Sequence, residues 1–204
     1  MTGAIAPADS WSRTPRLADA HVALEPLTQD HASGLVEAVA DGELSGLWFT
    51  MVPTAESVAR YIDDALSMRD AGAAMPFVVR DADGVIVGST RYCRMEPANR
   101  RLEIGYTWYA RRAWGTALNP AAKRLLLAHA FEQMGCIAVE FRTHWHNHRS
   151  RAAIARLGAK QDGVLRNHMI LADGIVRDTV VFSILDNEWP AVRRGLDMRL
   201  ESGR

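Results

Sequence analysis

The sequence predicts a single α/β domain in which helices flank a central mixed sheet that is largely antiparallel. Three observations predict this fold class. Apolar runs with strand-like alternation flank two Asp-Gly pairs, at 83–84 and 173–174, and such pairs favour tight turns between antiparallel strands. Over 101–143 a strand, a long helix and a second strand follow one another, which predicts one right-handed parallel crossover. No Ser-, Pro- or Gly-rich linker and no internal repeat divides the 204 residues.

The N-terminal half is predicted to contain three strands and two helices. Asp30 is a suitable N-cap for a helix that runs through Val39. Thr54 opens a second helix, whose apolar residues recur at helical spacing until Gly72 ends it. Strands are expected over 21–27, 77–80 and 85–95, followed by a polar turn at 98–100.

The strand predicted over 101–109 has two faces of different character. Alternation puts the large apolar residues on one face, namely Leu102, Ile104, Tyr106 and Trp108. It puts the small or polar residues on the other face, namely Glu103, Gly105 and Thr107. The two faces of this strand are therefore expected to have different roles.

The C-terminal half continues with alternating helices and strands. Pro120 suits the first turn of a helix, and Gly135 suits its end. Helices are expected from 119 or 120 to 134, from 147 or 150 to 157, and from 189 almost to the end of the chain. Strands are expected over 137–143, 164–171 and 175–185.

Composition argues against several classes of function. The chain has 24 Lys plus Arg against 24 Asp plus Glu, so no broad basic surface for nucleic acid or an anionic membrane is expected. Cys93 and Cys136 lie far apart, which favours buried thiols in a reducing cytoplasm over a zinc site or a redox dithiol. The N-terminus lacks a secretory pattern, and no run reaches the roughly 18 apolar residues of a membrane span. We expect residues 1–15 to be a flexible segment and residues 16–204 to form the domain.

The turn at 112–117, between a strand and a long helix, is the most informative junction. Small residues at Gly115 and Ala117 let backbone N–H groups approach a ligand, and the positive end of the following helix points at the same place. The turn thus predicts a pyrophosphate cradle, although a glycine here also suits ordinary turn geometry. It matches neither a nucleotide P-loop nor a dinucleotide-binding fingerprint.

The motifs, taken in order, resemble those of the GNAT N-acetyltransferase superfamily. Arg112, Gly115 and Ala117 match its acyl-coenzyme A loop, Gln/Arg-x-x-Gly-x-Gly/Ala. Residues 103–105 match its Glu-x-Gly strand motif, and 147–150 match its Asn-x-x-Ser helix start. The segment 151–159 is similar to one in the branch of ribosomal-protein-alanine N-acetyltransferases. Thr116 departs from the pattern, because many members have Lys or Arg there.

The resemblance implies a sheet of about seven strands, splayed between the fourth and fifth to hold acetyl-coenzyme A. It implies direct transfer of an acetyl group to a primary amine, which is either a small molecule or a protein N-terminus. A homodimer is also among the expectations. The residues that the resemblance assigns to coenzyme binding are Tyr106, Thr107, Trp108, Arg112, Ala113, Trp114, Gly115, Thr116, Ala117 and Asn147.

The resemblance also suggests catalytic residues. A protonated amine must lose a proton before it can attack, and a carboxylate can take that proton directly or through water. Glu103 is the first candidate, Glu140 competes with it, and either could be a solvated side chain. Ser150 is the suggested acid for the leaving thiolate, although a serine near a helix start is often a cap. Asn147 can be both an N-cap and a coenzyme ligand, and backbone N–H groups at 106–108 would stabilise the oxyanion.

Some segments of the chain, and its function, allow more than one interpretation. Residues His144, His146 and His148 alternate, but no carboxylate or cysteine lies nearby in sequence, so we expect no metal. Trp48, Phe49 and Met51 either wall the acceptor site or pack in the core. The alternative functions are transfer of another acyl group, such as succinyl, and a coenzyme-binding sensor without catalysis.

Overall fold

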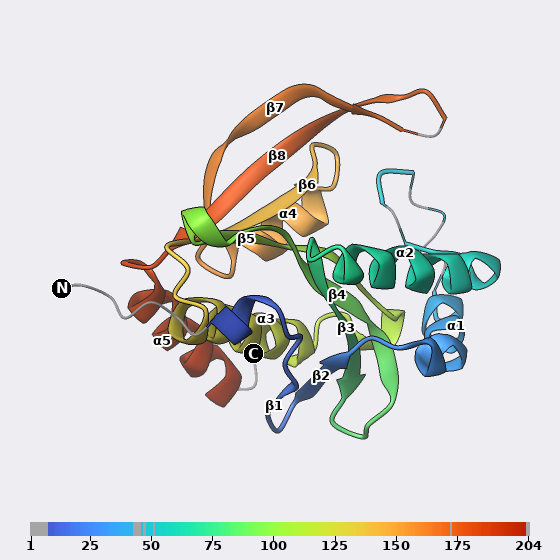
Figure 1. Cartoon of the computed structure of the whole chain (residues 1–204), viewed down its shortest axis with the longest axis horizontal. Coiled ribbons are helices and arrows are strands. Elements are labelled where there is room, and N and C mark those ends of the chain that lie inside the picture. The colour runs from blue at the N-terminus through green and yellow to red at the C-terminus, as the bar shows by residue number, and fades with distance from the viewer. Residues whose placement is uncertain (1–7, 43–45, 47, 51, 172, 203–204) are drawn as a thin grey trace.

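An eight-stranded sheet runs through the molecule in the order β1-β2-β3-β4-β5-β6-β8-β7 (Figure 1). The computed structural model describes residues 8–42, 46, 48–50, 52–171 and 173–202. Only the β5–β6 pair is parallel, which confirms the predicted mixed and mostly antiparallel sheet. The strands are β1 (Leu17–Ala18), β2 (Val22–Pro26), β3 (Ala74–Asp81), β4 (Ile86–Glu96), β5 (Arg101–Tyr109), β6 (Ala138–His144), β7 (Lys160–Ile170) and β8 (Val176–Leu185).

Both faces of the sheet are covered by helices (Figure 1). These are α1 (Ala32–Ala40), α2 (Val58–Asp70), α3 (Leu118–Ala128), α4 (His148–Ala155) and α5 (Trp189–Glu201). On one face, the Tyr61 hydroxyl of α2 donates to Ser89 Oγ at 3.1 Å. On the other face, the Tyr92 hydroxyl donates to the Leu126 carbonyl of α3 at 2.6 Å. Each buried polar tip therefore fixes a helix to β4 while the apolar rings fill the core.

Most predicted elements appear, with three informative differences. The two-residue β1 is an additional strand beyond the seven expected. The strand β3 starts at Ala74 rather than at 77, and Pro76 stands inside it, paired with Arg91. The helix predicted to reach 134 changes to a π-helix over His129–Gln133. In each case long-range pairing or packing outweighs the local pattern.

The alternation predicted for β5 is right as far as Gly105 and wrong beyond it. Tyr106 has a φ of 52°, and Thr90 lies opposite both Tyr106 and Thr107, so the strand contains a bulge. After the bulge, the Thr107 hydroxyl faces α3, and the Trp108 ring packs on Tyr61 of α2. Trp108 therefore shares the face of Glu103, and Thr107 does not.

The parallel pairing of β5 with β6 is short. It joins only three residue pairs and ends with Glu103 opposite Glu140, although β5 continues to Tyr109 and β6 to His144. The two strands then diverge, as the resemblance implied for its fourth and fifth strands. The additional β1 makes them the fifth and sixth strands here.

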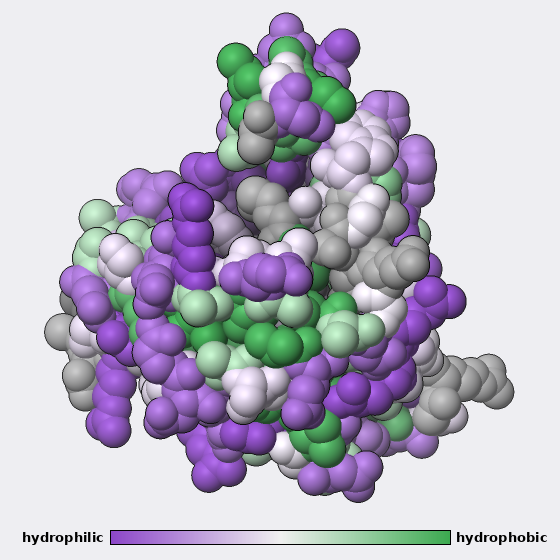
Figure 2. Space-filling view, turned by 90° about the vertical axis from the view of Figure 1, so that its right-hand side faces the viewer, coloured by the Kyte–Doolittle hydropathy of each residue, from purple (hydrophilic) through white to green (hydrophobic). Residues whose placement is uncertain are grey.

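The β7–β8 hairpin projects from the body of the molecule (Figures 1 and 2). Ile170, Ile175 and Val176 are exposed toward its end. At the other end of the chain, part of the segment expected to be flexible is packed on the domain. Ala8–Trp11 is a 3-10 helix, and the Trp11 indole donates to the Met134 carbonyl at 3.1 Å. Residues 1–7 lie outside the described part. No helix in the described ranges is long and apolar enough to cross a bilayer.

Gly88 permits the close approach of β4 and β5. A Cβ atom at this position would lie 3.0 Å from both Trp108 C and Tyr109 Cα, and closer still to the Trp108 carbonyl oxygen. We expect Gly88→Ala to lower the free energy of unfolding by about 2–4 kcal/mol, because backbone atoms must shift. Urea denaturation measures the effect, with Gly163→Ala as the control, since a Cβ there meets nothing within 4 Å. Equal stability of the two variants would contradict this account.

Candidate active site

A cavity of about 360 Å³ lies where β5 and β6 diverge. It is lined by parts of β5, β6, α3 and α4, together with the loop residues Phe49, Thr50 and Val52. Most of the predicted site residues meet in this cavity. They are Tyr106, Thr107, Trp108, Ala113, Trp114, Gly115, Thr116, Asn147 and Ser150.

The turn before α3 has free backbone donors, and two of the three residues that carry them, Gly115 and Thr116, line this cavity. Gly115 has a φ of 77°, which favours glycine and turns the chain into the helix. The Thr116 hydroxyl donates to the Ala113 carbonyl and accepts from the Leu118 N–H. The N–H groups of Gly115, Thr116 and Ala117 have no acceptor among the residues that the structure describes. Together with the dipole of α3, they form a site suited to an anion.

Two arginines flank Trp114 beside these donors. The Arg149 guanidinium of α4 lies 3.6 Å from the centre of the Trp114 ring, and Arg111 lies 4.8 Å from it. Burial and the nearby Arg111 charge lower the pKa of Arg149. Arg149 thus supplies from α4 a positive charge that Thr116 does not supply in the loop.

Arg112 and Ala117 lie outside the lining of this cavity. Arg112 donates through its backbone N–H to Asp41 Oδ2 at 3.1 Å and through its guanidinium to the Ile86 carbonyl at 3.1 Å. These contacts anchor the loop to β4 and to the end of α1. Ala117 lines a separate shallow hollow with Arg112. Coenzyme contact by either residue stays a prediction.

Asn147 and Ser150 are joined at the start of α4. The Asn147 side chain accepts the Ser150 N–H at 3.0 Å, so Asn147 is the N-cap of the helix. Ser150 is therefore not the cap. Ser150 lines the cavity, and its hydroxyl has no hydrogen-bond partner within the described ranges. That leaves the hydroxyl available to a ligand.

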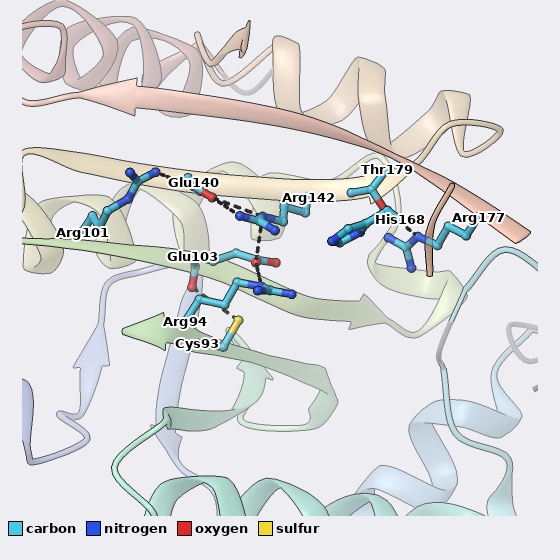
Figure 3. Close-up of polar contacts among 9 residues, drawn as sticks. All are labelled: Cys93, Arg94, Arg101, Glu103, Glu140, Arg142, His168, Arg177 and Thr179. Carbon is cyan, nitrogen blue, oxygen red and sulfur yellow. Dashed lines mark hydrogen bonds and ion pairs between the residues drawn. The ribbon is translucent and has the colours of Figure 1, made fainter. Parts of the chain in front are cut away.

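Glu103 and Glu140 lie side by side in a network of arginines (Figure 3). Glu103 pairs with Arg94 at 3.1 Å and with Arg142 at 3.5 Å. Glu140 pairs with Arg101 and accepts two bonds from Arg142, at 2.9 and 3.2 Å. Burial raises the pKa of Glu103, and the Arg142 and Arg94 charges oppose the rise. Neither carboxylate lines the cavity directly.

Gly105 provides the room that the Glu103 carboxylate occupies. A Cβ atom at position 105 would lie 2.7 Å from Glu103 Oε1 and 3.0 Å from Cys93 Sγ. Any other residue at 105 would therefore displace this carboxylate. This gives the Glu-x-Gly spacing a physical reason, because residues i and i+2 of a strand share a face.

Lys123 of α3 was not predicted to belong to the site. It is only 5% exposed and lines the cavity. Its ammonium donates to Thr107 Oγ1 at 2.7 Å and to Thr90 Oγ1 at 3.4 Å, with no carboxylate partner among the described residues. Burial lowers the pKa of Lys123 from 10.5 to about 7. In the sequence, Lys123 lies on an otherwise apolar helix face. Such a lysine is usually interpreted as lying at the edge of the buried face, so its position did not indicate a site residue.

The charge of the cavity lining has one sign. No aspartate or glutamate is among the described residues that line it. The cationic residues of the lining come from five helices and strands, namely Lys123, Arg142, Arg149, Arg156, Arg177 and Arg199. The site is therefore electropositive although the chain as a whole is neutral.

The histidine segment forms an aromatic cluster. Trp48 packs against His144 at 4.9 Å and against His146 at 5.6 Å, and Phe49 packs against His144 at 6.2 Å between ring centres. His148 is exposed at the start of α4. Within the described ranges no three His, Cys, Asp or Glu side chains are arranged to hold a metal. The prediction for Met51 lies outside those ranges.

The buried Lys123 amine predicts a stability that depends on pH. Between about pH 7 and pH 10 the unfolded chain keeps a proton that the folded protein has lost, so wild-type stability rises across this interval. We expect Lys123→Met to be more stable than wild type by about 1–3 kcal/mol at pH 6, and this difference to shrink by pH 9.5. Urea unfolding at several pH values measures it. A difference independent of pH would contradict a buried, titrating amine.

Comparison with known proteins identifies the family. The sequence model described as "Acetyltransferase (GNAT) domain" matches residues 21–160. A Bacillus subtilis protein named "Putative ribosomal N-acetyltransferase YdaF" is 33% identical over 107 residues. This alignment covers 52% of the chain and 57% of YdaF, so it spans little more than half of that relative.

Solved structures agree with this assignment. A GCN5-related N-acetyltransferase from Brucella melitensis has a TM-score of 0.82 and 28% identity, over 94% of this chain and 90% of that one. Mycobacterium smegmatis RimJ, in complex with CoA-disulfide, has a TM-score of 0.75 over 93% of this chain and 95% of that one. At 24% identity, RimJ shows a shared fold alone. The family model, which covers more than half of the sequence, and the splayed sheet together show that the chain belongs to the GNAT acetyltransferase family.

Proposed function

We propose that the protein moves an acetyl group from acetyl-coenzyme A to a primary amine by direct attack. The observation that carries this proposal is the cavity between β5 and β6, whose described lining has cations and free backbone donors but no carboxylate. Coenzyme A combines several phosphates with a slender apolar arm, so it needs this combination of positive charge and a narrow gap. The CoA-disulfide bound to RimJ, which has the same fold, supports the proposal.

The phosphate end of the donor would bind at the start of α3. The N–H groups of Gly115, Thr116 and Ala117 have no acceptor among the described residues, and Arg149 lies on the neighbouring Trp114 ring. The arm would follow β5, which has no strand partner on the β6 side after Glu103. Backbone groups at 106–108 would then bind the arm and stabilise the oxyanion.

Glu103 would take the proton from the acceptor amine. Its raised pKa makes it a better proton acceptor than an ordinary carboxylate, and Arg94 and Arg142 hold it in place. Because Glu103 does not line the cavity, a water molecule would relay the proton. Glu140 is the weaker candidate, because Arg142 donates hydrogen bonds to it and lies closer to it, at 2.9 Å, than to Glu103, at 3.5 Å.

The leaving thiolate would take a proton from Ser150. The neutral amine attacks the thioester carbon to form a C–N bond, and the adduct collapses as the C–S bond breaks. The second proton of the attacking nitrogen would pass through water to Ser150 and restore its hydroxyl. The Ser150 hydroxyl lines the cavity, and its backbone N–H is held by Asn147. Asn147 would thus position the acid as well as bind the donor.

We also propose which partners the protein has and where it is located. The acceptor is a small-molecule amine or a protein N-terminus, and we include neither nucleic acid nor membrane among the partners. A cytoplasmic location suits the two buried free thiols, Cys93 and Cys136. We include a homodimer of this protein among the proposed assemblies.

A ligand screen followed by a thiol-release assay tests the function. We expect acetyl-coenzyme A to raise the melting temperature, and ATP and NAD to have little effect, because neither has an arm that can enter the gap between β5 and β6. Thiol release should then accelerate with at least one amine of a panel. Stabilisation by ATP or NAD without any by an acyl-coenzyme A would rule the proposal out. Donor binding without amine-dependent release would favour the sensor.

Substitution of Glu103 tests the base. We expect Glu103→Gln to reduce kcat by about 10²-fold or more, with donor affinity nearly unchanged, because the amide cannot accept the proton. Gly105→Ala should also reduce kcat, since its methyl group displaces Glu103 Oε1. Glu140→Gln is the matched control and should lose less. If Glu103→Gln keeps full turnover while Glu140→Gln loses it, the roles assigned to the two carboxylates are reversed.

A further inference from the structure

Arg177 of β8 is a buried cation that lines the cavity without a carboxylate partner. It is 9% exposed, and no described acidic residue forms an ion pair with it. Its Nε donates to Thr179 Oγ1 at 3.1 Å, and the Thr179 hydroxyl also bonds with His168 at 3.0 Å (Figure 3). The two terminal guanidinium nitrogens have no partner among the described residues.

His144 of β6 also lines this cavity and holds an unpartnered donor. It is 3% exposed, and its Nδ1 accepts the backbone N–H of His146 at 3.0 Å. The neutral ring therefore carries its proton on Nε2. That atom is buried without a hydrogen-bond partner in the described ranges. Burial and the Arg177 charge lower the pKa of His144. Both side chains line the same cavity.

The other buried arginines nearby have partners. Arg142 is shared by Glu140 and Glu103. Arg91 lies between the rings of Tyr61 and Tyr106, at 5.0 and 4.0 Å from their centres. Glu103 attracts Arg177 at longer range, but its carboxylate is already held by Arg94 and Arg142. Arg177 therefore differs from Arg142, which pairs with carboxylates, and from Arg91, which two aromatic rings cover although its Nε also lacks a partner among the described residues.

A buried guanidinium and a buried N–H donor are both costly without an acceptor. A carboxylate satisfies both, because its two oxygens can accept from the terminal nitrogens of Arg177 and from His144 Nε2. From this geometry we infer that Arg177 and His144 form a subsite for a carboxylate group of a substrate. The inference rests on the proposed acyl transfer and adds that one of the two substrates is acidic.

The carboxylate can belong to either substrate. It is the far end of a dicarboxylic acyl group on the donor, or it is a carboxylate on the acceptor amine. Both sources place the same group in the cavity where β5 and β6 diverge. Two arms of one kinetic experiment distinguish them.

The experiment measures thiol release by the full chain with substrate pairs that differ in one carboxylate. The donor arm compares succinyl-coenzyme A with butyryl-coenzyme A, at a fixed amine. The acceptor arm uses acetyl-coenzyme A and compares glycine with glycinamide, and alanyl peptides with glutamate or glutamine in second place. We expect kcat/KM to favour the acidic member about 10- to 100-fold in one arm.

Variants then assign the preference to the subsite. Arg177→Met should bring the ratio of acidic to neutral kcat/KM close to one, and Arg177→Lys should retain part of it. His144→Phe should reduce the ratio while keeping a ring beside Trp48. Arg166→Met is the control, because Arg166 lies on the same hairpin but is exposed and pairs with Asp178. It should leave the ratio unchanged.

The outcomes separate this inference from the proposed function. Transfer that shows no acidic preference in either arm overturns the subsite and leaves acyl transfer standing. A preference that survives Arg177→Met also overturns the subsite. Absence of transfer from every donor to every amine overturns the proposed function and the subsite with it.

Discussion

The divergence of β5 from β6 after Glu103 is the constraint on which the rest of the site depends. Three residue pairs hold the strands together, and the last pair places two glutamates side by side. Like charges in this position repel, and this repulsion is offset by Arg142, which contacts both carboxylates, and by Arg94 and Arg101, which each contact one. Beyond these ion pairs the backbone of β5 has no strand partner on the β6 side, and the cavity begins there.

The same ion pairs matter for the proposed chemistry. They hold Glu103 in a buried place where desolvation favours the protonated form and the arginines favour the ionised form. The room for that carboxylate exists because Gly105 has no side chain. Glu103 can therefore accept a proton near the electropositive cavity although it does not line that cavity.

Several features of the structure could be predicted from the sequence because they depend only on neighbouring residues. The turn at Gly115 requires a left-handed conformation, and the Asn147 side chain caps a helix start, so both could be expected from neighbouring residues. The bulge at Tyr106 could not be expected, because it arises from the mismatch between β4 and β5. That single extra residue reversed the predicted faces of Thr107 and Trp108.

The order of strands and helices, the hairpins and the motifs of an acyl-coenzyme A loop could all be predicted from the sequence, since each depends on residues close together in the chain. Its equal counts of acidic and basic residues argued against a broad polyanion-binding surface. Where the charges lie depends on the tertiary structure. The fold gathers cations from α3, α4, α5, β6 and β8 around one cavity, and it leaves Lys123 and Arg177 there without carboxylate partners in the described part. Such a local excess of charge depends on which distant segments pack together, so it cannot be read from composition.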